Sequence, residues 1–134
     1  MTWQSIALAT AGVIGGIVSI IHGVLTQRLM VAPFETLSAG EGQLSAPVRR
    51  LVPALLQFST FNWFLGGLAL IAAALWFGRD ARLVTGLLVG SSYLYAAAGN
   101  LWGTRAWHPG WMLMVAALIL IVFGIGWNGD TGRP

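Results

Sequence analysis

Cysteine is absent from this 134-residue sequence, and charged side chains make up only 8% of it. Without cysteine the chain has no disulfide, no thiol nucleophile and no thiolate ligand for zinc or an iron–sulfur cluster. Lysine is absent as well, and the seven arginines stand singly or in pairs at the ends of apolar segments. This scattered distribution argues against nucleic acid as a partner and favours lipid headgroups.

Apolar residues dominate what is present, at 57% of the chain. Soluble domains carry about a quarter charged residues, so this composition predicts an integral membrane protein. A spanning helix needs roughly 20 mostly apolar residues, and four stretches meet this requirement: residues 5–27, 51–77, 81–103 and 109–127. Short connections between the last three stretches force neighbouring helices to run antiparallel. The sequence therefore predicts an all-α, integral membrane, up-down four-helix bundle.

The connections and the aromatic residues define two ends of this bundle. Residues 28–50 are expected to form one long loop, because they are rich in proline, glycine and serine, although residues 32–37 suit a short interfacial helix. We call the end that receives this loop the loop end, and the end with both chain termini the terminal end. Tryptophan favours the membrane boundary. Trp3, Trp76 and Trp127 fall at the terminal end, and Trp102, Trp107 and Trp111 at the loop end. Residues 1–134 are thus one transmembrane domain, with Pro109 in the first turn of the last helix and His108 near its N-cap.

Charged side chains lie at or near the ends of the predicted spans, which argues against a buried carboxylate relay or a charged transport path. The remaining polar side chains are neutral or histidine, and most of them lie between the middle of the bundle and the loop end. A ligand pocket that opens toward the loop end would explain this one-sided distribution. The residues predicted to line it are His22, Gln57, Ser59, Asn62, Trp63, Tyr93, Tyr95 and Asn100. The alternative for each of them is a hydrogen bond between helices.

His22 shares a helix face with Gly12 and Gly16, whose lack of a side chain lets another helix approach closely. It therefore points at a neighbouring helix, where its alternatives are an interhelix hydrogen bond, proton transfer or contact with a ligand. No metal site and no cofactor is predicted. A haem held between His22 and His108 is disfavoured, because His108 lies at the membrane boundary and His22 lies deeper.

Three features of the chain carry a resemblance to known proteins. They are the glycine-rich first helix, "PALLQFSTFNWFLGGLALI" in the second helix and "HPGWMLMVAALILIVFGI" in the fourth. Together they resemble the DoxX-like families of small bacterial four-helix membrane proteins. The resemblance implies a multi-pass protein of the bacterial inner membrane, with cytoplasmic termini, that serves as a partner or accessory subunit. It implies no catalytic residue, because these families share no uniform activity.

The leading functional hypothesis is a binding protein that holds a hydrophobic ligand with a polar head, such as a lipid, quinone or isoprenoid. A first alternative is an accessory or assembly subunit, whose glycine-rich helix faces meet a partner membrane protein or another copy of the chain. A second alternative is a membrane-embedded enzyme that uses His22 as acid or base, assisted by Tyr93 or Tyr95. Membrane lipids are expected partners in each case.

Overall fold

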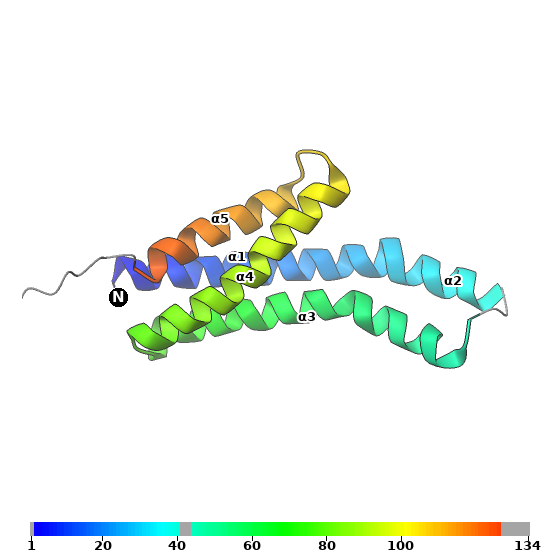
Figure 1. Ribbon diagram of the computed structural model, residues 1–134, viewed down its shortest axis with the longest axis horizontal. Coiled ribbons are helices and arrows are strands. Elements are labelled where there is room, and N and C mark those ends of the chain that lie inside the picture. Colours follow the sequence, from blue (N-terminus) through cyan, green and yellow to red (C-terminus); the bar gives the residue numbers. More distant parts are fainter. Residues whose placement is uncertain (1, 41–43, 127–134) are drawn as a thin grey trace, which may run out of the picture.

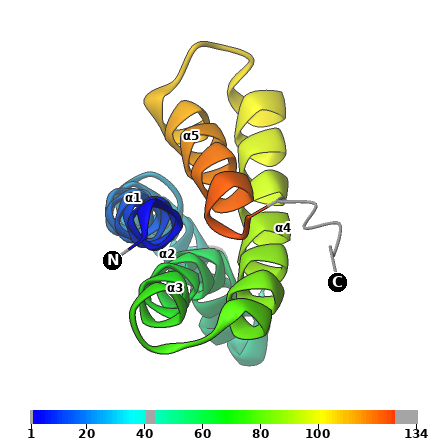
Figure 2. The same cartoon turned by 90° about the vertical axis from the view of Figure 1, so that its left-hand side faces the viewer.

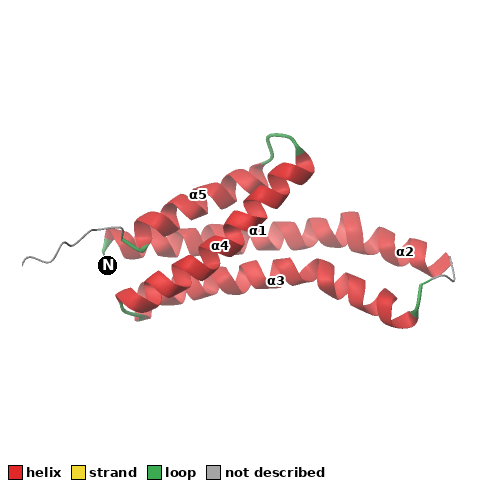
Figure 3. Cartoon of the chain, viewed as in Figure 1, coloured by secondary structure: helices red, strands yellow, loops and turns green. Residues whose placement is uncertain are grey.

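The computed structural model describes residues 2–40 and 44–126, and these residues are helical almost throughout (Figure 3). The helices are α1 Trp3–Thr26, the π-helical turn η1 Gln27–Val31, α2 Ala32–Gly40, α3 Ala46–Trp76, α4 Arg79–Thr104 and α5 Pro109–Gly124. The prediction of an all-α chain with four helices is confirmed, because η1 and α2 continue α1. The predicted end of the last helix at Trp127 lies outside the described residues.

The loop expected at residues 28–50 is largely helical, which corrects that prediction. Helix α1 passes through η1 into α2 and stops at Gly40, and α3 already begins at Ala46. Pro47 stands in the first turn of α3, where the missing N–H costs little, because first-turn N–H groups have no partner within the helix. Pro33 instead lies inside the continuous segment Trp3–Gly40, just after the π-helical turn η1. The wider turn of η1 accommodates the proline, because it interrupts the regular α-helical hydrogen bonding just before the residue that has no N–H.

The last helix begins as the sequence predicts. Pro109 is its first residue, and the Nδ1 atom of His108 accepts a hydrogen bond of 3.1 Å from the N–H of Gly110. At the other end of the connection, α4 ends at Thr104, and its C-cap residue Arg105 adopts a left-handed conformation with φ of 48°. The connection between α4 and α5 is therefore short and has a defined shape at both of its ends.

The four long helices form a closed ring in which α1 packs on α3 and α5, and α4 packs on α3 and α5. Figures 1 and 2 show two antiparallel pairs, the long α1–α3 pair and the shorter α4–α5 pair, which crosses it. Both views show the α4–α5 pair moving away from α1 and α3 as it approaches its connection. The two pairs are therefore most separated at this end of the α4–α5 pair.

The tightest contact in the core joins α1 to α3 through glycine. A Cβ atom on Gly12 would lie 2.5 Å from the carbonyl oxygen of Gly67, and one on Gly67 would lie 2.6 Å from the carbonyl oxygen of Gly12. The close helix approach expected at Gly12 is thus present. Around it lies a core of small and aliphatic side chains, whose buried members include Leu8, Ala11, Leu70, Ala73, Met114, Ala117 and Ile121.

The outer surface of the helices is strongly apolar. Large hydrophobic side chains on every long helix are exposed, among them Ile17 on α1, Leu68 on α3, Leu88 on α4 and Ile119 on α5. Two helical segments, Trp3–Gly40 and Ala46–Trp76, are long and apolar enough to cross a membrane.

Candidate functional site

A cavity of about 220 Å³ lies where the α4–α5 pair separates from α1 and α3. Residues from all four long helices and from the connection before α5 line it. They are Val18, Ile21, His22, Trp63, Asn100, His108, Pro109, Gly110 and Leu113. The walls are aliphatic and aromatic, and the polar groups come from two histidines, one asparagine and one indole. This combination of apolar walls with a few convergent polar groups is typical of a small-molecule site.

His22 is held in one orientation by contacts on two sides of its ring. Its Nε2 atom lies 3.2 Å from the Ser59 hydroxyl and 3.3 Å from the Thr26 hydroxyl. Its ring packs against the Trp63 indole, with 4.5 Å between ring centroids. Both contacts use Nε2, so Nδ1 is the ring nitrogen that has no hydrogen bond to another described residue. Nδ1 accepts a hydrogen bond in one neutral tautomer of the ring and donates one in the other.

His108 presents a donor to the same cavity. Because its Nδ1 atom accepts from the N–H of Gly110, a neutral ring carries its proton on Nε2. The helix cap thus fixes the tautomer of this side chain. The sequence predicted the capping role of His108, but it placed the residue at a different depth from His22. The structure brings the two histidines to one cavity.

Asn100 and Trp63 complete the polar lining. The side-chain N–H of Asn100 donates to the carbonyl of Ala96 at 2.9 Å, which fixes the amide and leaves its oxygen as a possible acceptor. Trp63 lies in the middle of α3, with 7% of its surface exposed. Its indole N–H forms no hydrogen bond to another described residue, and the side chain is part of the cavity wall.

Three of the eight residues predicted to bind a ligand, namely His22, Trp63 and Asn100, therefore line one cavity. Ser59 lies behind them as the hydrogen-bond partner of His22. Gln57 joins α3 to α1 instead, because its side-chain N–H donates to the carbonyl of Gly23 at 3.1 Å. Asn62 is exposed and donates to the Ser92 hydroxyl at 3.0 Å, which joins α3 to α4.

The two tyrosines do not reach this cavity. Tyr93 is fully buried against Gly15, and its hydroxyl donates to the backbone carbonyl of Trp63 at 3.3 Å. Tyr95 points outward, with 83% of its surface exposed. Neither tyrosine therefore lines the cavity with His22, where it was predicted to assist an acid or base.

Sequence reasoning missed the contribution of the last helix to the cavity. Leu113 and the start of α5 form one wall, opposite Val18 on α1. The histidine and proline that begin α5 were a signal for a helix start, but the approach of this start to α1 depends on how the two helix pairs cross. Among the described residues, no three His, Asp or Glu side chains gather where they could hold a metal ion.

Comparison of the chain with protein-family models, with curated proteins and with solved structures found no match.

Proposed function

We propose that the chain is an integral membrane protein that crosses the bilayer with α1, α3, α4 and α5. The support is a composition with 8% charged residues, two helical segments that are long and apolar enough to span, and large hydrophobic side chains on the outer faces. The DoxX-like resemblance adds the bacterial inner membrane and cytoplasmic termini to this proposal.

Its proposed function is to bind a hydrophobic ligand with a polar head, such as a lipid, quinone or isoprenoid, in the cavity beside His22. One observation carries the proposal: His22, Asn100 and His108, which lie on different helices, converge on one apolar-walled cavity. Interhelix hydrogen bonding explains Gln57 and Asn62, whose side chains are bonded to neighbouring helices. It does not explain why His108 lines the cavity, since its capping bond uses only Nδ1 and Nε2 has no hydrogen bond to another described residue.

The hydrogen-bonding groups indicate what the head must offer. The Nε2–H of His108 and the indole N–H of Trp63 are donors, and the amide oxygen of Asn100 is an acceptor. Nδ1 of His22 is a donor or an acceptor according to the tautomer of the ring. A carbonyl oxygen on the ligand head would accept hydrogen bonds from the two donors. A hydroxyl group would accept from one donor and donate to one acceptor. The cavity is smaller than the roughly 300–1,000 Å³ of pockets for drug-sized ligands. It therefore suits the polar head of the ligand and the first carbons of its acyl or isoprenoid chain. The rest of the chain would leave the cavity past the exposed apolar side chains of Ile21 and Leu113.

The test is mass spectrometry of the organic extract from the full chain purified in a mild detergent. We expect a bound amphiphile at close to one molecule per chain. The variant Val18→Phe should lose it, because the larger ring fills the cavity that Val18 lines. The matched control is Val13→Phe, on an exposed position of the same helix. The proposal is rejected if the wild type carries only bulk lipid, or if a folded Val18→Phe variant retains the amphiphile.

A second candidate, a subunit that docks on a partner membrane protein, is supported by the outer face of α4. A Cβ atom at Gly99 or Gly103 would meet nothing within 4 Å, and Tyr95 is exposed beside them in the sequence. Small residues on such a face let a second helix approach closely. A photo-crosslinking amino acid at position 103 should then capture a defined membrane protein in cells. Crosslinks to lipid alone would count against this candidate.

A further inference from the structure

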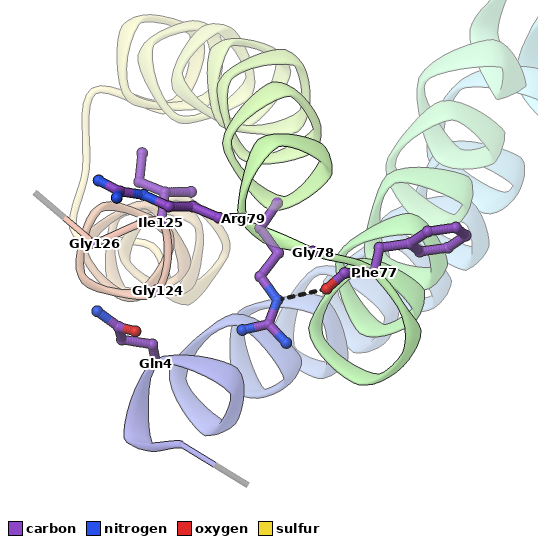
Figure 4. Close-up of a pocket in the computed structure, with 8 residues that line it drawn as sticks. Gln4, Phe77, Gly78, Arg79, Gly124, Ile125 and Gly126 are labelled. Atoms are coloured by element: carbon purple, nitrogen blue, oxygen red, sulfur yellow. Dashed lines mark hydrogen bonds between the residues drawn. The ribbon is translucent and has the colours of Figure 1, made fainter.

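A second cavity, of about 350 Å³, lies at the terminal end of the bundle, apart from the cavity beside His22. It is formed where α1 begins, α3 passes into α4 and α5 ends (Figure 4). Its lining residues are Gln4, Phe77, Gly78, Arg79, Arg82, Gly124, Ile125 and Gly126. Two guanidinium groups and one carboxamide therefore share a small space in a chain that has seven basic residues in all.

Arg82 is anchored in the wall of this cavity. Its Nε atom donates to the carbonyls of Ala73 and Phe77, each at 3.1 Å, and its Nη2 atom donates to the carbonyl of Ala74 at 2.8 Å. These carbonyls belong to the last turn of α3 and to its C-cap, where no further helical N–H can reach them. The bonds hold the guanidinium still and use only part of its five N–H groups. Its positive charge stays at the cavity.

Arg79 and Gln4 face the cavity from other helices. Figure 4 shows the Arg79 side chain reaching over the end of α5 near Ile125, with the Gln4 side chain of α1 on the other side of the opening. Arg79 is exposed and forms no hydrogen bond to another described residue. Asp80, the nearest carboxylate in the sequence, is not part of the lining. The lining thus carries two positive charges, several free N–H donors and no carboxylate.

We propose that this cavity binds a phosphate group, as carried by an anionic lipid headgroup or by a free phosphate. Guanidinium groups bind phosphate through paired, charge-assisted hydrogen bonds, and their planar geometry matches its oxygens. A cavity of about 350 Å³ has room for the phosphate of a headgroup. Trp3 and Trp76 are 61% and 74% exposed and lie next to lining residues in the sequence, as expected for aromatic side chains at a membrane boundary. That the phosphate belongs to a lipid headgroup rests on the proposed membrane insertion. That the cavity binds a phosphate group does not depend on it.

The test measures lipid binding to the delipidated full chain in detergent by native mass spectrometry. The probes are dioleoylphosphatidic acid and dioleoylphosphatidylcholine, which share their acyl chains and differ in headgroup charge. We expect one molecule of phosphatidic acid to bind at least about tenfold more tightly than phosphatidylcholine. The variant Arg79→Gln should bind phosphatidic acid about tenfold more weakly than the wild type, because a hydrogen bond to a charged group is lost. Gln4→Leu, which leaves both charges in place, should weaken binding less.

The matched control is Arg105→Gln, which removes one positive charge at the loop end. It should bind phosphatidic acid as the wild type does, and so should Val18→Phe, which fills only the other cavity. Displacement of the lipid by millimolar inorganic phosphate would identify the phosphate group alone as the ligand. Failure to displace it would identify the whole lipid. The proposal is overturned if the wild type does not distinguish the two lipids, or if Arg105→Gln weakens binding as much as Arg79→Gln.

Discussion

His108 has two roles at the start of α5. Its Nδ1 atom caps the helix by accepting from the N–H of Gly110, and the residue also lines the cavity beside His22. The first role fixes the tautomer that the second role uses, because Nδ1 accepts and Nε2 must then donate. Replacing this one side chain therefore affects both helix stability and ligand binding, and two different substitutions separate the effects.

We predict that His108→Ala lowers the free energy of unfolding by about 1 kcal/mol, the usual cost of losing an N-cap acceptor. His108→Asn should stay close to the wild type in stability, because asparagine is a good N-cap. Both variants should retain less of the co-purified amphiphile, since both lack the Nε2–H donor. Unfolding by denaturant in mixed micelles and mass spectrometry of the extract measure the two quantities. Full amphiphile retention in His108→Asn would contradict the binding role.

The helices α1 and α3 depend on glycine where they touch. A Cβ on Gly12 would meet the carbonyl oxygen of Gly67 at 2.5 Å, and backbone atoms cannot move aside as a side chain can. Gly16, one turn later on the same helix, has nothing within 4 Å of its Cβ position. The two glycines look equivalent in the sequence, but only the first one limits the distance between the helices.

We therefore predict that Gly12→Ala lowers the free energy of unfolding by about 1–3 kcal/mol, the usual range for overpacking. Gly16→Ala should be neutral or slightly stabilising, because alanine favours the helix and meets no neighbour. Thermal unfolding of both variants in the same detergent makes the comparison. Equal loss of stability in the two variants would show that the α1–α3 contact is not as close as described.

The whole molecule is longer along the α1–α3 pair than a bilayer is thick. The continuous segment Trp3–Gly40 has 38 residues, or about 57 Å of helix, against a hydrocarbon core of about 30 Å. The α2 end of this segment and the first turns of α3 extend past the shorter α4–α5 pair (Figure 1). The proposed membrane placement then leaves α2 outside the bilayer, at the loop end.

Single cysteines test this placement directly, because the chain has none of its own. In sealed, oriented vesicles we predict that Thr2→Cys and Gly78→Cys are labelled from one side by a membrane-impermeant maleimide, and Ala106→Cys and Leu37→Cys from the other. Leu94→Cys, at an exposed position in the middle of α4, should resist labelling because it faces lipid. Labelling of all five positions from one side would rule out the four-span topology.

Length, composition and helical periodicity were enough to predict four helices, their antiparallel order and the cap at His108. Each of these follows from local properties, such as the run of apolar residues or the place of Pro109 in a first turn. The same local signals failed at residues 28–50. A proline often ends a helix, but it is tolerated in a first turn, as at Pro47, or after a π-helical turn, as at Pro33. The sequence alone did not show that these two cases applied.

The tertiary structure decided which residues line the candidate site. Helical phase places a residue on a face of its own helix, and it grouped His22, Asn62 and Tyr93 as lining residues. Which faces meet depends on the crossing of the α1–α3 and α4–α5 pairs. This crossing depends on contacts between residues far apart in the sequence, such as Gly124 of α5 with Leu8 of α1. The crossing opens the bundle beside His22 and brings His108 to it, while Tyr93 stays in the packed core. The sequence therefore determined the helices and their polar residues, and the angle between the helix pairs determined which of those residues share a cavity.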